Sequence, residues 1–549
     1  MKIATWAPGS LRIASYSLAL VTLALLLSGL TAASADSHHP DVLPLGALPP
    51  GVESAGAVAL RPSVAGAGIS YYVSASGNDS NPGTLSLPWR TIQHAANSIM
   101  AGDTVFVRGG LYKEHVNVPV SGNAAVGFIT FQSYPGETAM VDGTGLDVPN
   151  GQYGLFNING QSYLIIQGFE IRNYKTSSTK YVPVGIYIYG AGSNLQILNN
   201  HIHDIQTSAR GCNANALGLA VYGTQAPGSI NNLTISGNEI DHLKTGCSET
   251  ISMDGNVQFF VVTHNLIHDN NNIGIDAIGF EGVAPPGSMC GSDPCDRARD
   301  GLIAQNTVYK ITSYGNPAYG NQYAADGIYV DGGARVIIER NRIYQVDLGI
   351  EMASEHSGKT TDHIIARNNL VYFGNSAGIS IGGYASGVGG SDSCTIVNNS
   401  LLFNDRKNTG SGEFQIQFHA TNNVFKNNIA YATRQGLLVN NFTRSEPNPA
   451  DIDFNVYHSA VGATNSNFVW NGKTYTGFAA YQSATGKDPH SFFADPLYVS
   501  LTTPDLHVAT TSPAVNAGID LGQAIVGDVD FAGNPRVQGS NIDIGAYEQ

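Results

Sequence analysis

Short apolar stretches recur along the chain, and most end in an asparagine that is followed two positions later by another apolar residue. Copies read LQILNNHI, LTISGNEI, FVVTHNLI and VIIERNRI. The eight aligned asparagines are Asn200, Asn238, Asn265, Asn306, Asn341, Asn369, Asn399 and Asn427. Their spacing runs from 27 to 41 residues, so a repeat of about 28 residues carries insertions in its longer copies. Internal repetition on this scale is typical of solenoid proteins.

A second stretch in each repeat alternates apolar and polar positions, as in GIYIYG, GLAVYG, TISMDG and GIYVDG. Alternation with period two predicts a strand with one face turned inward. Short strands combined with a stacked asparagine at one corner predict an all-β fold, a right-handed parallel β-helix. A leucine-rich repeat would need a Leu-dense consensus and helical returns, and a β-propeller would need tight hairpins. Neither pattern is present.

The two ends of the predicted solenoid differ from its body. Ile92, Ala95, Ala96 and Ile99 have helical spacing, so we expect a short helix that caps the N-terminal end. Residues 451–500 are rich in aromatic residues and break the repeat. We therefore expect a β-helix over residues 70–445 and a C-terminal lobe and capping segment over 446–549, packed on the helix.

The first residues look like a targeting signal. Lys2 and Arg12 precede an apolar run from Leu18 to Leu30, and small residues end at Ala35. This order predicts a signal peptide over residues 1–35, with an uncleaved membrane anchor as the alternative. Residues 36–69 are rich in Pro, Gly and Ala and indicate a linker. The mature protein is then secreted, without a membrane attachment.

The charge balance narrows the classes of partner. The chain has 27 Lys and Arg against 42 Asp and Glu, a net charge of −15. Nucleic acids and anionic membranes need clustered basic residues, so neither is expected as a partner. The oligomeric state is not indicated by any pattern.

Five cysteines suit an exported chain with few disulfides rather than a disulfide scaffold. Cys290 and Cys295 are candidates to close a small loop, and Cys212 and Cys247 to pair across neighbouring turns. Cys394 occupies an apolar strand position and is expected to be a buried thiol. No spacing indicates zinc.

The stretch YYVSASGNDSNPGTLSLPWRTIQHAANSIMAGDTVFVRGGLYKEHV resembles the opening of many secreted pectate-lyase-like β-helix proteins that act on polysaccharides. The closing stretch SPAVNAG, DVDFAGNPRV and DIGAYE is similar to a C-terminal element of the same group. The resemblance implies the fold and export, whereas the group contains lyases, hydrolases, epimerases and non-enzymatic proteins.

Four consecutive turns each place one carboxylate on the outward face of the second strand: Asp254, Asp276, Asp331 and Glu351. We call these four residues the carboxylate row. Adjacent turns stack about 4.8 Å apart, which puts the Cβ atoms of diagonal neighbours about 8 Å apart. That spacing admits both retaining and inverting glycosidase geometries, since side chains are flexible. The same oxygens are also candidate ligands of a Ca²⁺ ion.

Insertions over residues 207–216, 281–300 and 313–326 fall beside the carboxylate row and predict loops that flank a cleft. Candidate substrate-binding residues in or near this cleft are Asp254, Tyr329, Tyr189, Tyr222, Glu355, His356 and Asp326. Aromatic rings and carboxylates together suit sugars, which offer an apolar face and many hydroxyl groups.

Three functions fit these patterns. The first is a glycoside hydrolase with Asp331 and Glu351 as the central pair and with Asp276 and Asp254 assisting, without a required cofactor. The order Asp then Glu on adjacent turns resembles the β-xylosidases of this fold, which implies an Asp nucleophile and a Glu acid/base. The second is a Ca²⁺-dependent polysaccharide lyase or uronate epimerase. The third is a non-catalytic glycan-binding protein.

Overall fold

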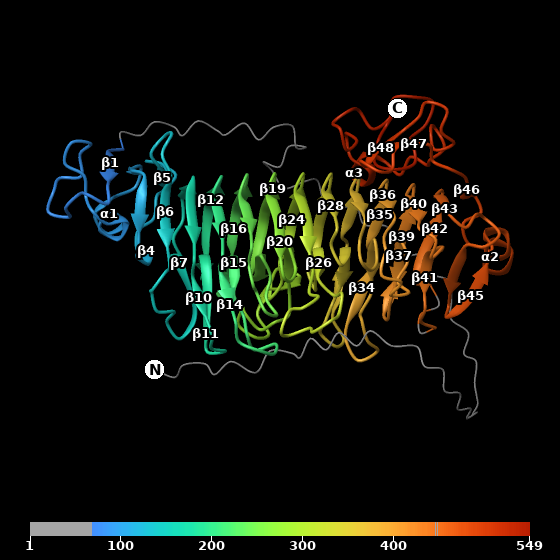
Figure 1. Ribbon diagram of the computed structural model, residues 1–549, viewed down its shortest axis with the longest axis horizontal. Coiled ribbons are helices and arrows are strands. Elements are labelled where there is room, and N and C mark those ends of the chain that lie inside the picture. The colour runs from blue at the N-terminus through green and yellow to red at the C-terminus, as the bar shows by residue number, and fades with distance from the viewer. Residues whose placement is uncertain (1–67, 445, 447) are drawn as a thin grey trace.

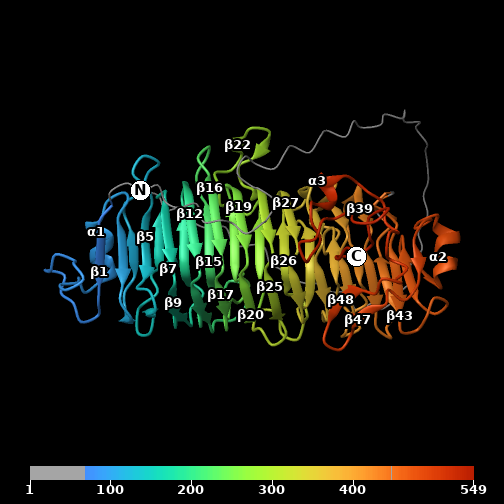
Figure 2. The same cartoon turned by 90° about the horizontal axis from the view of Figure 1, so that it is seen from above.

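The computed structural model describes residues 68–549 except 445 and 447. The predicted signal peptide at 1–35 and nearly all of the linker predicted at 36–69 lie outside the described residues. Three long sheets run along the molecule, and the strands of each stack from one end to the other (Figures 1 and 2). Among the described residues, no helix is long and apolar enough to cross a bilayer.

Sheet A contains the strands that precede the asparagine corner. Its strands are, in spatial order, β1 (Ser70–Val73), β2 (Thr104–Val107), β5 (Ile129–Ser133), β8 (Leu164–Gln167), β12 (Gly192–Leu198), β16 (Ile230–Ser236), β19 (Val257–Thr263), β24 (Arg299–Ala304), β27 (Ala334–Glu339), β31 (Ile365–Arg367), β35 (Thr395–Val397), β39 (Asn423–Lys426) and β42 (Ala450–Asp453), with β30 (Thr360–Asp362), β34 (Gly390–Asp392) and β38 (Ala420–Thr421) at its side.

Sheet B follows the asparagine corner. Its strands are β3 (Gly110–Tyr112), β6 (Ala139–Asp142), β9 (Phe169–Arg172), β13 (His201–His203), β17 (Glu239–Asp241), β20 (Leu266–Asn270), β25 (Thr307–Ile311), β28 (Arg342–Tyr344), β32 (Leu370–Tyr372), β36 (Ser400–Leu402), β40 (Ile429–Ala432), β43 (Val456–Ser459) and β46 (Phe492–Phe493).

Sheet C contains the alternating strands. They are β4 (Val116–Val118), β7 (Gly151–Asn159), β11 (Tyr181–Tyr189), β15 (Leu217–Gly223), β18 (Ile251–Gly255), β21 (Ile275–Ile278), β26 (Asp326–Asp331), β29 (Leu348–Ala353), β33 (Ile379–Ile381), β37 (Phe414–Ile416), β41 (Leu437–Asn441), β44 (Asn467–Trp470) and β45 (Lys473–Thr476). The pairing is parallel throughout the solenoid, and only β44 and β45 form an antiparallel hairpin within these three sheets. The predicted all-β, parallel β-helix fold is confirmed.

The core is a set of apolar columns inside the three sheets. On sheet C, the inward residues in register are Ile186, Leu219, Ile251, Ile275, Ile328, Ile350, Ile379 and Phe414, all fully buried. Burial of a side chain of this size stabilises the fold by about 1.5–3 kcal/mol. Cys394, the only free cysteine, is also buried, as expected.

The asparagines form a continuous ladder at the corner between sheets A and B. Each amide donates to a backbone carbonyl of the preceding turn and to the amide oxygen of the next asparagine; Asn306, for example, donates to Val262 O at 2.9 Å and to Asn341 Oδ1 at 3.0 Å. The residue before each ladder position adopts a positive φ, as Asn427 does at 55°. The ladder therefore continues through Asn428 and not through Asn427, which corrects the predicted alignment by one residue.

Both ends of the solenoid are covered. Helix α1 (Ile92–Ser98) buries Ile92, Ala95 and Ala96, as predicted for an N-terminal cap. At the other end, β42, β43 and β46 add turns beyond the predicted boundary at 445, and Asn455 continues the ladder. The expectation that residues 451–500 break the repeat is therefore wrong for the start of that segment, where Tyr457 is fully buried on an extra turn. Helix α2 (Phe478–Thr485) buries Phe478 and Tyr481 at this end.

The last residues turn back along the outside of the asparagine corner (Figure 1). This segment contains β47 (Tyr498–Ser500), β48 (Asp505–Val508) and α3 (Gln523–Val526). Asn368 donates to Val526 O at 3.0 Å, and Asn427 donates to Ile519 O at 2.8 Å. The positive-φ residues of the corner thus fasten the C-terminal segment to the solenoid.

Candidate functional site

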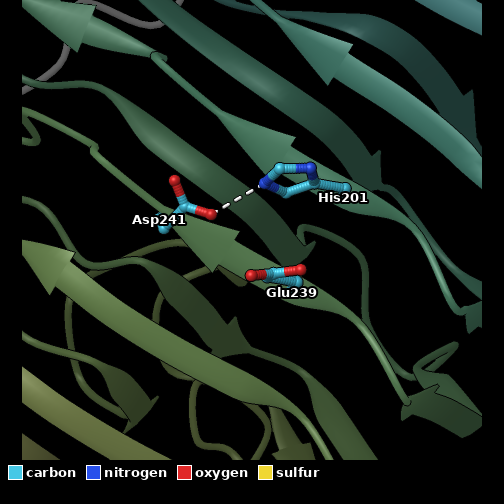
Figure 3. Close-up of side chains that lie close together, drawn as sticks. All are labelled: His201, Glu239 and Asp241. Carbon is cyan, nitrogen blue, oxygen red and sulfur yellow. Dashed lines mark hydrogen bonds and ion pairs between the residues drawn. The ribbon is translucent and has the colours of Figure 1, made fainter.

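Two groups of side chains in the described part of the chain could hold a metal ion, and they lie on different sheets. The first, His201, Glu239 and Asp241, is on the outside of sheet B (Figure 3). The second is Glu281, Asp331 and His356, at the edge of sheet C. In each group, one ligand atom per residue lies within 4.8 Å of the others. The second group includes a member of the carboxylate row.

The strand register brings the carboxylate row together as the sequence indicates. Asp276 pairs with Tyr329, and Tyr329 pairs with Glu351 on the next strand. Asp254 lies in the neighbouring column, opposite Tyr222. The row therefore crosses four adjacent strands of sheet C, from β18 to β29.

The row is more deeply covered than an open cleft would be. Asp276 and Asp331 are fully buried, Asp254 is 4% exposed, and Asp326 and Tyr329 are 2% exposed. Glu351 is half-buried and is thus the most accessible carboxylate of the row.

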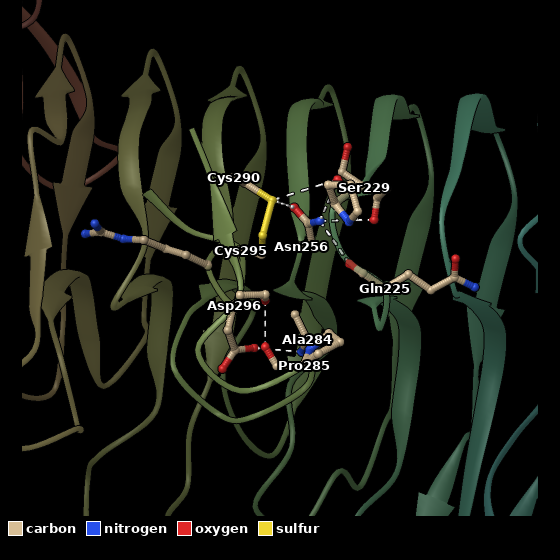
Figure 4. Close-up of a disulfide and its surroundings, with 12 residues drawn as sticks. Gln225, Ser229, Asn256, Ala284, Pro285, Cys290, Cys295 and Asp296 are labelled. Atoms are coloured by element: carbon tan, nitrogen blue, oxygen red, sulfur yellow. Dashed lines mark hydrogen bonds between the residues drawn. A yellow bond between two sulfur atoms is a disulfide. The ribbon is translucent and has the colours of Figure 1, made fainter. Parts of the chain in front are cut away.

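The loop after β21, residues 279–297, is held by a disulfide and a central carboxylate (Figure 4). Cys290 and Cys295 are bonded, and β22 (Met289–Cys290) pairs with β23 (Asp293–Pro294) beside them. The Asp296 carboxylate accepts hydrogen bonds from the backbone N–H of Gly282 at 2.7 Å and of Ala284 at 2.8 Å. The loop is therefore an ordered cover.

Val283 of this loop packs on the strand that carries Asp254. A Cβ on Gly255, whose φ is +73°, would lie 2.7 Å from Val283 Cγ1, so only glycine fits there. Val283 also contacts the tyrosine cluster, in which Tyr187 stacks on Tyr189 at 4.5 Å and meets Tyr222 edge-on at 5.9 Å. Tyr222 is buried within this cluster, whereas Tyr189 is half-buried.

A second loop, residues 312–325, lies at the opposite ends of the same strands. The Asn316 amide donates to Gly246 O at 2.7 Å and to Asn271 O at 2.9 Å. A disulfide between Cys212 and Cys247 fastens the adjoining turn. The row is thus bounded at both strand ends, by 279–297 and by 312–325.

Asp331 is held beneath the turn that follows β29. Its Oδ1 accepts the backbone N–H of Glu355 at 2.8 Å. His356 Nε2 lies 3.2 Å from Glu281 Oε1, and this hydrogen bond raises the pKa of the imidazole, with burial opposing. His356 is therefore biased toward its charged form beside Asp331.

Glu351 is oriented by an amide from two turns further along. Gln417 Nε2 donates to Glu351 Oε1 and to Ser380 Oγ, each at 2.6 Å. An amide that bridges two acceptors in this way fixes the orientation of the carboxylate.

The electrostatic environment of Asp254 is strongly altered by burial and by neighbouring carboxylates. Burial raises its pKa well above the usual range, and the carboxylates of Glu281, Asp296, Glu249 and Asp331 raise it further. Its Oδ1 is buried without a hydrogen-bond partner. Such an oxygen is either part of a neutral carboxyl group or a ligand of a bound cation.

Two basic side chains beside the carboxylate row lie over the aromatic ring of Phe280. The Arg297 guanidinium lies 5.3 Å from the ring centroid, and Lys359 Nζ lies 5.1 Å from it. Arg297 is bound to the carbonyls of Gly332 and Gly333 at 2.7 and 2.9 Å. Lys359 is exposed.

Sequence reasoning missed Glu281, Gln417 and the sheet B group. Glu281 lies three residues after the end of sheet C strand β21, but its position over Asp331 depends on the loop conformation. The sheet B group is visible in NHIHD, NEIDH and NLIHD, in which His or Asp occupies the third and fourth positions after the ladder asparagine.

A separate groove of about 700 Å³ follows the corner between sheets B and C. It runs from β10 (Lys175–Thr176) and β14 (Gln206–Thr207) to the 312–325 loop. Its lining includes Lys175, Lys244 and Lys310, together with Asp204 and Asp269. The groove lies beside the carboxylate row and is not part of it.

Comparison with known proteins identifies the group to which the chain belongs. The profile of the family described as Pel9A-like, right handed beta helix region, matches residues 71–448. The protein named "Uncharacterized protein YwoF" from Bacillus subtilis is 38% identical over 452 residues, 82% of this chain and 92% of that one. Pectate lyase PEL9 of Emericella nidulans is 29% identical over 184 residues, 31% of this chain and 42% of that one.

A solved structure, that of XylC in complex with xylose, has the same fold. It superimposes with a TM-score of 0.53 at 13% identity and covers 87% of this chain and 98% of that one. The match confirms the fold, and the family match confirms the predicted right hand of the helix and its pectate-lyase-like character. The chain belongs to the Pel9A-like family of right-handed β-helix proteins.

Proposed function

We propose that the protein is a secreted glycoside hydrolase that cleaves a polysaccharide or oligosaccharide at the carboxylate row, with Asp331 and Glu351 as the reacting pair. The observation that carries this proposal is the register of sheet C, which gathers four carboxylates on four adjacent strands between two ordered loops. Closely spaced carboxyl groups with different environments divide the roles of acid and base.

The environments of the two residues suit different roles. Glu351 is half-buried and oriented by Gln417, so it is placed to donate a proton to the leaving glycosidic oxygen and later to accept one from water. Asp331 lies deeper, with one oxygen bound to the backbone N–H of Glu355. As a carboxylate it would attack the anomeric carbon, once substrate displaces the turn that carries Glu355 and His356.

The remaining carboxyl groups would shape the site. Asp254, whose pKa is raised by burial and by neighbouring carboxylates, is biased toward its neutral form, which can donate a hydrogen bond. Asp276 lies one strand from Asp331, and Tyr329 lies between Asp276 and Glu351 in the same column. Tyr189, Asp326, Glu355 and His356 border this area as candidate substrate contacts.

A Ca²⁺-dependent lyase is the second candidate, and a specific observation favours it. Glu281, Asp331 and His356 have ligand atoms within 4.8 Å of one another, beside the unpartnered Oδ1 of Asp254. Carboxylate oxygens fit Ca²⁺, which would neutralise a uronate carboxylate near the base. Lys359 is the exposed basic side chain nearest to this group by sequence and would serve as that base. The similarity to a protein named pectate lyase agrees with this candidate.

Product chemistry separates the candidates. Neutral and uronic polysaccharides are digested with and without a calcium chelator, and each digest is assayed for new reducing ends and for the ultraviolet absorbance of an unsaturated uronate. The proposal predicts reducing ends without that absorbance, unaffected by chelation. Unsaturated product that disappears on chelation would replace the hydrolase with the lyase, and no product on any substrate would favour a glycan-binding protein.

A further inference from the structure

The outer face of sheet B carries a lattice of histidines and carboxylates on three consecutive strands. His201 of β13 pairs in register with Glu239 of β17, and His203 pairs with Asp241, which pairs with His268 of β20. In Figure 3 the His201 ring and the Asp241 carboxylate point toward one another from adjacent strands, with Glu239 beside them. Sheet B is a different face of the solenoid from the carboxylate row.

The donor atoms of this lattice converge. His201 Nε2 lies 2.7 Å from Asp241 Oδ2, and His268 Nε2 lies 3.3 Å from Glu239 Oε1 and 3.9 Å from Asp241 Oδ2. Ligand atoms around a tetrahedral Zn²⁺ at bond lengths of about 2.0–2.1 Å are about 3.3 Å apart. The separations in the lattice bracket that value, so small side-chain rotations bring the atoms around one ion.

The second nitrogen of His268 is already engaged. Nδ1 lies 2.8 Å from Asp269 Oδ2, and Lys310 Nζ lies 3.2 Å from Asp269 Oδ1. The other ring nitrogen, Nε2, faces Glu239 Oε1 and Asp241 Oδ2. Its 3.3 Å separation from Glu239 is longer than a charge-assisted hydrogen bond of about 2.7–2.9 Å, so this contact leaves room for the atoms to turn toward one ion.

The surroundings match those of metal-binding histidines. Such rings usually donate their other N–H to a carboxylate, and their carboxylate co-ligands are themselves hydrogen-bonded. Asp241 Oδ1 is bound by His242 Nδ1, and the Tyr309 ring stacks on His268 at 4.8 Å. The His268 side chain is 11% exposed and that of Asp241 is 7% exposed, so both are held in place by packing.

We propose that His201, Glu239, Asp241 and His268 form a binding site for a divalent transition-metal ion of the Zn²⁺ type, which clamps three turns of the solenoid together. Two imidazoles and two carboxylates are a ligand set that Zn²⁺ accepts in four-coordinate sites. The site spans strands 27 to 38 residues apart in sequence, so a bound ion stabilises the folded chain over the unfolded one. The proposal is independent of the reaction at sheet C.

The test measures metal binding by the chelator-stripped mature protein. Zn²⁺ is titrated by calorimetry, and Co²⁺ is used as a probe because its visible absorption reports tetrahedral coordination. The expected result is one metal ion bound per protein molecule. The affinity for this ion should fall at least about 100-fold in His201→Ala and in His268→Ala. It should fall about 10–100-fold in Asp269→Asn, which removes only the hydrogen-bond partner of the ligand His268.

Two variants serve as controls. His490 Nδ1 pairs with Asp453 Oδ2 at 2.7 Å in a similar way, but it is outside the groups that could hold a metal, so His490→Ala should retain the ion. His356→Ala should also retain it, which separates sheet B from the second group on sheet C. The proposal is overturned if the wild type binds neither metal at micromolar concentration. Unchanged stoichiometry and affinity in folded His201→Ala and His268→Ala would overturn it as well.

Discussion

His356 Nε2 lies 3.2 Å from Glu281 Oε1, although the two residues are 75 positions apart in sequence. The contact joins the turn after β29 to the disulfide-bearing loop after β21, and Asp331 lies beside both residues. The two side chains are 22% and 26% exposed. The pair thus connects the loop after β21 to the turn after β29, and these two segments cover the carboxylate row.

This pair should make the stability of the protein depend on pH. The pKa of His356 is raised above the usual 6.5, chiefly by its hydrogen bond to Glu281. Its stabilisation is therefore complete below about pH 6.5 and is lost as pH rises through the folded-state pKa. His356→Gln should lower Tm by about 1 °C at pH 6 and by less at pH 9. Calorimetry at both pH values checks this, and Glu281→Gln should behave alike; a difference independent of pH would contradict it.

The buried carboxyl group of Asp254 should also make the stability of the protein fall as pH rises. Its folded-state pKa is raised, so the native state holds a proton that the unfolded chain loses above about pH 4. Stability therefore falls as pH rises, and Asp254→Asn removes that loss. In the presence of a metal chelator, Asp254→Asn should have a higher Tm than the wild type at pH 7 and a similar Tm at pH 4. If millimolar Ca²⁺ reverses the order at pH 7, the carboxylate is a metal ligand and the lyase gains support.

The asparagine ladder should contribute strongly to stability. Asn306 donates to Val262 O and Asn341 Oδ1, and it accepts from the backbone and side chain of Asn265. Asn306→Ala leaves buried groups on both sides unsatisfied, which should cost about 2–4 kcal/mol of unfolding free energy. Denaturant unfolding measures the loss. Asn465→Ala, at an exposed site with one hydrogen bond to Val461 O, is the matched control and should change little.

The proposed catalytic pair makes a direct prediction for activity. Glu351→Gln and Asp331→Asn should each lower kcat by about 10²–10⁴-fold, because each removes a group that transfers a proton or forms a bond. Asp451→Asn removes an exposed carboxylate on sheet A and should leave kcat unchanged. Initial rates on the substrate found by the digestion panel decide the matter. Equal, small losses in all three variants would place the reaction elsewhere.

The fold was predictable because its signals are local and repeated. The ladder asparagines and the alternating sheet C residues carry their positions in every turn, so strand register followed from alignment alone. The misaligned ladder position, Asn427 for Asn428, arose where two asparagines are adjacent. Only the backbone shows which of them takes the positive φ and which points into the ladder.

The sequence predicts which positions of sheet C the site residues occupy, but it does not predict how deeply these residues are buried. Asp254, Asp331 and Glu351 fall where the repeat places them. Their exposure depends on the loop that carries Glu281 and on the distant amide of Gln417, and these contacts follow from loop conformation rather than from repeat position. The sheet B lattice repeats at fixed positions after the ladder asparagine, yet its chemistry appears only when neighbouring strands are placed side by side.

The location of a bound oligosaccharide tests the central claim most directly. A crystal structure of Asp331→Asn with a slowly cleaved oligosaccharide would show which surface the sugar occupies. The account predicts sugar rings over sheet C, between residues 279–297 and 312–325, with a glycosidic oxygen within hydrogen-bond distance of Glu351. Sugar bound instead in the corner groove lined by Lys175, Lys244 and Lys310, and distant from Glu351, would contradict it.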